Sequence, residues 1–147
     1  RQCHYPPSGT GVNVGLLIIT HEGIGGALLR TAIHTLKRCP LNAAVLEVAQ
    51  DNKIEPYRSR ALELIEQLDQ GAGVLVLTDL YGATPGNIAS KLHDGKRIIT
   101  VTGINLPMVM RVLNYSNMEL PELAEKALGG GRDCVFVCDQ ESECGGD

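Results

Sequence analysis

Several kinds of residue and segment are scarce in this chain of 147 residues, and each scarcity excludes a class of function. There is no tryptophan and a single phenylalanine, so we do not expect nucleic-acid binding by stacking of bases on aromatic side chains. The formal net charge is −4 and no basic cluster occurs, which also argues against a nucleic-acid partner. No apolar run approaches the roughly 20 residues that span a bilayer, so no direct membrane insertion is expected.

The first residues and the cysteines indicate the class of protein. The opening sequence RQCHYPPSGTG has no apolar segment typical of a secretory signal, so a cytoplasmic protein is expected. We interpret residues 1–11 as a flexible extension, 12–138 as one domain and 139–147 as a disordered acidic tail. The five cysteines match no common zinc-binding spacing, which favours reduced thiols over a metal site or disulfides. We expect no metal and no cofactor.

Apolar runs alternate with helical patterns along the chain. Strands are predicted at residues 14–21, 43–48, 74–78 and 97–102, and helices at 24–38, 54–69, 85–93, 107–113 and 119–128. This alternation predicts an α/β fold with a doubly wound, mainly parallel sheet flanked by helices, in the strand order 2-1-3-4. Three glycines at 129–131 are expected to end the last helix. Residues 134–138 (CVFVC) then predict a fifth strand at an edge of the sheet.

The stretch VGLLIITHEGIGG, residues 14–26, places His21 at the carboxyl end of a buried strand. Ligands bind at this edge of open α/β sheets. The glycines after His21 permit a tight turn into a helix, whose first N–H groups favour an anion. Gly23, Ile24 and Gly25 are therefore candidate phosphoryl-binding residues. A histidine that only caps the loop is the structural alternative, and this stretch alone does not decide between the two.

Two further strand ends carry polar residues. In the order 2-1-3-4, Asp79 faces His21 where the chain reverses direction, and a carboxylate bonded to one imidazole nitrogen leaves the other free as a nucleophile. Thr84 is a good helix cap and also offers its hydroxyl to phosphoryl oxygens. Asn105 either supports the phosphoryl group or shapes the turn before Pro107. An aspartyl-phosphate on Asp79 itself is a competing interpretation.

A nucleotide-binding role has weak support in the sequence. The GIGG run resembles a dinucleotide-binding loop, but Leu28 stands where the third glycine of that motif belongs. The glycine-rich loop that cradles nucleotide triphosphates, with its lysine, is absent. A small-ligand binder or nucleotide enzyme of the same wound fold stays as an alternative, which calorimetry with nucleotides would separate.

Three segments resemble one protein family: IITHEGIGGALLRTA, VLTDLYGATPGNIASKL and VTGINLPMVMRVL. They are similar to the signature segments of the mannose-type (mannose/fructose/sorbose) enzyme IIA domain of the bacterial phosphoenolpyruvate-dependent sugar phosphotransferase system. The likeness spans residues 14–132. It implies that His21 accepts a phosphoryl group from phospho-HPr through Nε2, with Asp79 at Nδ1 and Thr84 at the phosphoryl site. It also implies a homodimer in which a carboxyl-terminal strand, here 134–138, crosses to the partner subunit.

The resemblance leaves two roles open. Members of the family pass the phosphoryl group to a IIB partner, and some carry that domain on the same chain, whereas this chain shows no linker and IIB domain. It is expected either to serve a separate IIB protein or to be a stand-alone regulatory phospho-acceptor that binds a partner according to its phosphorylation state. The NLPM segment is more similar to the sugar branch than to the branch that phosphorylates dihydroxyacetone through a kinase subunit.

Overall fold

The computed structural model describes residues 12–51 and 53–139. The predicted extension at 1–11 and the tail residues 140–147 lie outside the described residues. Four strands form one parallel sheet in the order β2-β1-β3-β4: β1 (Gly15–His21), β2 (Ala43–Val48), β3 (Val74–Thr78) and β4 (Ile98–Thr102). The predicted α/β fold and strand order are therefore confirmed.

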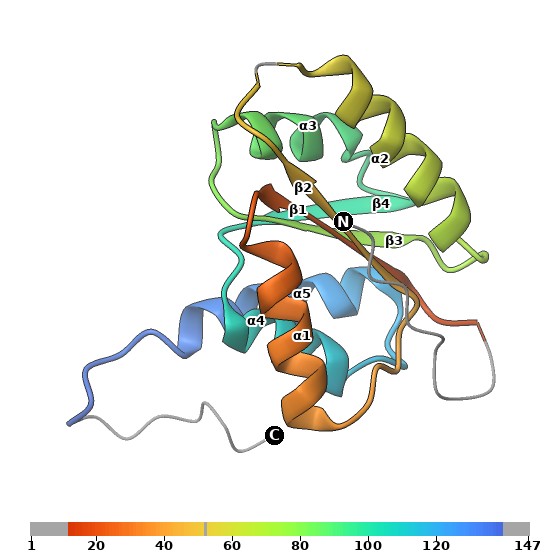
Figure 1. The fold of residues 1–147 in the computed structure, drawn as a ribbon. Coiled ribbons are helices and arrows are strands. Elements are labelled where there is room, and N and C mark those ends of the chain that lie inside the picture. The colour runs from red at the N-terminus through yellow and green to blue at the C-terminus, as the bar shows by residue number, and fades with distance from the viewer. Residues whose placement is uncertain (1–11, 52, 140–147) are drawn as a thin grey trace.

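Within the described residues, five helices cover the two faces of the sheet: α1 (Gly25–Leu36), α2 (Glu55–Leu68), α3 (Thr84–Leu92), α4 (Leu106–Asn114) and α5 (Leu120–Asp133). Figure 1 shows α2 and α3 on one face, and α1, α4 and α5 on the other. The bounds of the first four helices agree closely with those expected from the apolar spacing. The result is a three-layer domain in which helices cover both faces of the sheet, with β1 and β3 buried and the edge strand β4 partly exposed.

The strand β1 shows why its sequence is apolar without alternation. Leu16 and Ile18 pack into a core with α1, α4 and α5, whereas Leu17 and Ile19 pack into a second core with α2 and α3. All four side chains are fully buried. Successive side chains of a strand point to opposite faces, so a strand covered on both faces needs apolar residues at every position.

The last helix is longer than expected, because the glycines at 129–131 do not end it. The helix α5 continues to Asp133. A Cβ atom added to Gly130 would lie 2.6 Å from Arg111 Cβ, and one added to Gly131 would lie 2.7 Å from Met108 Cε. These glycines thus let α5 approach α4 closely. Tertiary packing outweighs the low helix propensity of glycine here.

The fifth strand expected at 134–138 is wrong for this single chain. Cys134 is the C-cap of α5, and Val135, Phe136 and Val137 are exposed and belong to no strand. Figure 1 shows this segment leaving α5 in a direction away from the sheet. Because α5 extends through the glycines, the apolar segment does not return to either sheet edge, β2 or β4.

The cysteines also differ from the expectation of reduced thiols. Cys39 and Cys138 are free, but Cys134 is disulfide-bonded, so the expectation is wrong for Cys134. Burial raises the pKa of the Cys39 thiol and outweighs the effect of its hydrogen bond to the Leu41 carbonyl.

Within the described ranges, no group of three or more acidic, histidine or cysteine side chains is placed to hold a metal ion. Across the same ranges, every helix is too short or too polar to cross a bilayer.

Candidate functional site

The centre of the candidate site is a contact between two neighbouring strand ends. His21 ends β1, and Asp79 directly follows β3, which pairs with β1. The His21 ring Nδ1 lies 2.8 Å from Asp79 Oδ2, and the His21 backbone N–H donates to the same oxygen at 2.9 Å. The parallel register therefore brings together two residues that are 58 positions apart in the sequence.

The environment of Asp79 determines which nitrogen of the His21 ring carries the hydrogen. Burial opposes ionisation of Asp79, but hydrogen bonds from the His21 backbone, the His21 ring and the Leu80 N–H outweigh burial and lower its pKa. An ionised carboxylate only accepts hydrogen bonds, so Nδ1 must be the donor. Nε2 of a neutral ring then carries a lone pair. The His21 side chain is 30% exposed, against 12% for Asp79, so the ring is reachable from solvent.

The turn between β1 and α1 is held by groups within the protein. The buried Thr20 hydroxyl donates to the His21 carbonyl at 2.8 Å and accepts from the Gly25 N–H at 2.8 Å. The Gly26 N–H donates to Glu47 Oε2 at 2.9 Å, and the Ile24 N–H to the His21 carbonyl at 3.4 Å. The first amides of α1 are thus engaged.

Of the predicted glycine loop, Ile24 and Gly25 therefore use their N–H groups inside the turn. Gly23 has a φ of 85°, in the left-handed region that favours glycine, and a Cβ there would meet nothing within 4 Å. The loop thus shapes the turn beside His21, and an incoming phosphoryl group would have to displace existing hydrogen bonds to reach Gly25 N–H.

A cleft of about 530 Å³ connects His21 with the start of α3. Thr84 lies in its wall together with Ala83 and Pro85. The expected capping role of Thr84 is wrong: Ala83 is the N-cap, Thr84 is the first residue of α3, and no side-chain hydrogen bond caps this helix. Helix geometry leaves the first N–H groups of α3 without intrahelical acceptors. The cleft thus combines an imidazole, a hydroxyl and a helix amino end.

Asn105 has a different position. Its Oδ1 accepts from the Met108 N–H at 2.9 Å and caps α4, and its Nδ2 donates to the Gly131 carbonyl at 3.0 Å. Both ends of the amide therefore join α4 to α5. Asn105 does not line the cleft that contains His21, which matches the structural alternative of shaping the turn before Pro107.

Two amide side chains in the cleft were missed by the sequence interpretation. Gln50 follows β2 and Asn87 lies in the first turn of α3, and both line the cleft with His21. Asn87 Nδ2 donates to the Gly82 carbonyl at 3.3 Å and so steadies the loop before α3. The place of Gln50 depends on the parallel register, in which Val48 pairs with His21 and Gln50 stands two residues further on, and no local pattern in the sequence marks it.

Comparisons with known proteins assign the chain to a family. Residues 15–128 match the family described as "PTS system fructose IIA component". The PTS system mannose-specific EIIAB component of Escherichia coli K12 is 27% identical over 127 residues, which cover 84% of this chain and 39% of that protein. The PTS system fructose-specific EIIA component of Bacillus subtilis is 24% identical over 92 residues, covering 61% of this chain and 63% of that protein. The chain thus spans about two fifths of the EIIAB relative.

Solved structures share the fold. The mannose/sorbose specific IIA subunit of the phosphotransferase system from Enterococcus faecalis superposes with a TM-score of 0.76 at 21% identity, covering 88% of this chain and 97% of that one. The PTS IIA protein associated with the fucose utilization operon from Streptococcus pneumoniae gives 0.72 at 24% identity, with 90% and 98% covered. At these identities the likeness supports the architecture alone.

Proposed function

Because the chain belongs to the phosphotransferase-system fructose IIA component family, we propose that it is a phosphohistidine carrier in which His21 is the phosphorylated residue. The observation that carries this proposal is the 2.8 Å contact between His21 Nδ1 and Asp79 Oδ2. That contact leaves Nε2 as the nucleophilic nitrogen, and the ring lines an open cleft.

The transfer step is a displacement at phosphorus. The lone pair of His21 Nε2 forms the new N–P bond, the bond from phosphorus to the donor nitrogen breaks, and its electron pair leaves with the donor imidazole. The ring gains positive charge, which the ionised Asp79 stabilises through Nδ1–H. In this proposal the phosphoryl oxygens are bound by the Thr84 hydroxyl and the amino end of α3, which is supported by their position in the lining of the same cleft. Positioning and charge stabilisation account for most catalysis of phosphoryl transfer.

The partners follow from the same proposal. The donor is phospho-HPr, the acceptor is a IIB protein, and the site of action is the cytoplasm, where this system operates. The homodimer belongs to the proposal as well. Val135, Phe136 and Val137 are exposed in the single chain, and an exposed apolar segment of this kind is typical of a surface that a second subunit covers.

Phosphorylation in a reconstituted system tests the proposal. The chain is incubated with phosphoenolpyruvate, enzyme I and HPr, and acid-labile phosphate is measured on the native chain and on His21→Ala. Labelling is expected on the native chain and absent from His21→Ala. Equal labelling of both proteins would refute the assignment of His21. Loss of the label on addition of a IIB protein would identify a transport carrier, whereas retention of the label with altered partner binding would identify a regulatory phospho-acceptor.

A further inference from the structure

The residues that line the cleft at His21 determine how it can bind the phosphoryl group that it is proposed to receive. Of the residues that the structure describes, the polar ones that line it are His21, Gln50, Thr84 and Asn87, with no lysine or arginine among them. A transferring phosphoryl group carries negative charge that must be stabilised by hydrogen-bond donors or cations. Among the described residues of this cleft, the negative charge is therefore stabilised by uncharged hydrogen-bond donors, and each available N–H and O–H group contributes to that stabilisation.

Gln50 is placed to be one of these donors. His21 pairs with Val48 across β1 and β2, so the two side chains project to the same face of the sheet. Gln50 stands two residues beyond Val48, and it lines the cleft together with His21 and Thr84. In residues 12–51 and 53–139, nothing hydrogen-bonds to the Gln50 amide, whereas the amide of Asn87 is already bonded to Gly82.

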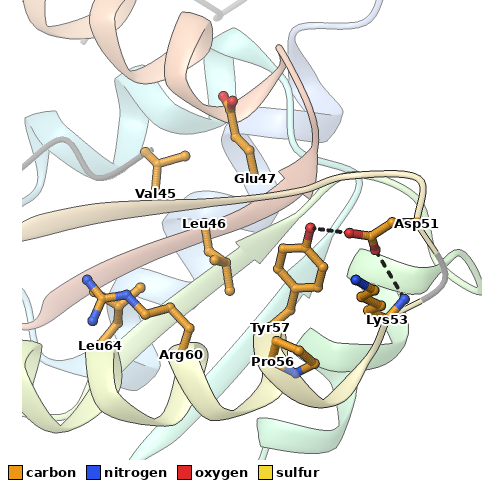
Figure 2. A pocket seen from close by; sticks show the side chains of 9 residues that line it. All are labelled: Val45, Leu46, Glu47, Asp51, Lys53, Pro56, Tyr57, Arg60 and Leu64. Atoms are coloured by element: carbon orange, nitrogen blue, oxygen red, sulfur yellow. Dashed lines mark hydrogen bonds between the residues drawn. The ribbon is translucent and has the colours of Figure 1, made fainter.

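Tyr57, on α2, contacts the residues on either side of Gln50. The Ala49 N–H donates to the Tyr57 hydroxyl at 3.2 Å, and that hydroxyl donates to Asp51 Oδ2 at 3.1 Å. Figure 2 shows Tyr57 rising from α2 toward Asp51 in a second cavity, of about 380 Å³, that lies between β2 and α2. One aromatic side chain thus anchors both neighbours of Gln50, which limits the positions that the Gln50 amide can take.

We propose that Gln50 is a phosphoryl-binding residue, which donates its side-chain N–H to an oxygen of the phosphoryl group on His21 Nε2 while Tyr57 positions the backbone around it. The proposal rests on the proposed function of His21 and adds a donor from the end of β2. The phosphoryl group then lies between β2 and α3, with Gln50 on one side and Thr84 on the other.

Three variants and a matched control test this contact. Gln50→Met keeps the length of the side chain and removes the donor. Gln50→Glu adds a carboxylate beside the phosphoryl oxygens, and Tyr57→Phe removes only the anchoring hydroxyl. Gln67→Glu is the control, because it makes the same charge change on an exposed residue near the far end of α2. Rates are measured with phospho-HPr and, separately, with phosphoramidate, a small donor that has no protein surface.

Gln50→Glu should lower the rate about 10- to 100-fold relative to Gln67→Glu, because like charges within a few ångströms repel strongly in a partly closed site. Gln50→Met should lower it about fivefold, the effect of one lost hydrogen bond, and Tyr57→Phe by a smaller factor. The phosphorus NMR signal of phosphorylated His21 should shift in Gln50→Met. Circular dichroism of each variant separates these effects from loss of folding.

Each remaining outcome contradicts part of the reasoning. If Gln50→Glu and Gln67→Glu are phosphorylated at the same rate, with an unmoved phosphorus signal, Gln50 does not contact the phosphoryl group. A defect seen with phospho-HPr but not with phosphoramidate would make Gln50 a contact for the donor protein and overturn the proposal. If the native chain takes up no phosphate from either donor, the proposed function of His21 fails and this inference fails with it.

Discussion

Asp79→Asn changes the hydrogen bonding of His21 while keeping the size of the side chain. In the native chain Asp79 Oδ2 accepts from the His21 backbone and ring at 2.9 and 2.8 Å, and Oδ1 accepts from the Leu80 N–H at 2.8 Å. An amide has one oxygen and one NH₂ group, so either orientation sets the NH₂ group against a donor. If that group faces His21, the ring must accept at Nδ1, and its hydrogen moves to Nε2, the proposed nucleophile.

The expected loss follows from the charge that Asp79 holds beside the ring. A hydrogen bond to a charged group contributes about 1.5–3 kcal/mol, and about 1.4 kcal/mol corresponds to a tenfold change in rate. We therefore expect Asp79→Asn to slow transfer from phospho-HPr by about 10- to 150-fold. A shift of the His21 ring hydrogen to Nε2 would slow transfer further, so a loss of about tenfold is the smallest that we expect.

A rapid-quench measurement of single-turnover transfer from labelled phospho-HPr checks this expectation. Asp94→Asn is the matched control, because Asp94 Oδ1 also accepts backbone N–H groups, from Lys96, Arg97 and Ile98, but outside the cleft. The control should transfer at the native rate. A folded Asp79→Asn protein that transfers within about threefold of the native rate would show that Asp79 does not set the state of His21.

Three other expectations concern stability and the phosphoryl site. Since its hydrogen bonds lower the pKa of Asp79, its contribution to folding is present above about pH 4 and is lost below it, so acid should reduce the urea midpoint of the native chain more than that of Asp79→Asn. Gly130→Ala should destabilise the chain by about 1–3 kcal/mol by colliding with Arg111. Gly129→Ala should instead stabilise it by up to about 1 kcal/mol, because a Cβ there would meet only Asp133 Oδ2, at an ordinary contact distance of 3.8 Å; a matching thermal shift for both variants would contradict this. Thr84→Val should slow transfer about tenfold while Thr84→Ser stays close to native, as measured in the same quench assay.

The pairing of His21 with Asp79 could be predicted because strand order turns a long sequence separation into a short distance. Buried parallel strands can be identified in a sequence as short apolar runs, and their alternation with helices restricts the order in which the strands pair. Once β1 and β3 are neighbours, residues at their carboxyl ends must lie together. Local pattern and topology were sufficient for this half of the site.

Gln50 and the glycines of α5 could not be predicted in the same way. Gln50 is an exposed residue in a connection, where no periodicity marks it, and its importance depends on the register between β1 and β2. Gly130 looked like a helix end because glycine has low helix propensity. Its close contact with Arg111 on another helix reverses that expectation, and such a contact is invisible in the local sequence.

The proposed position of the phosphoryl site, at α3 and not at α1, follows from the charges at two helix amino ends that lie at one edge of the sheet. Each end carries a partial positive charge that attracts one anion. At α1 the Glu47 carboxylate already accepts from the Gly26 N–H, so a second anion there would meet both an engaged amide and a like charge. At α3 no side chain caps the helix, and its first residues open into the cleft with His21. His21 thus precedes α1 in sequence, yet the electrostatics of its surroundings favour α3 for the phosphoryl group that we propose on its ring.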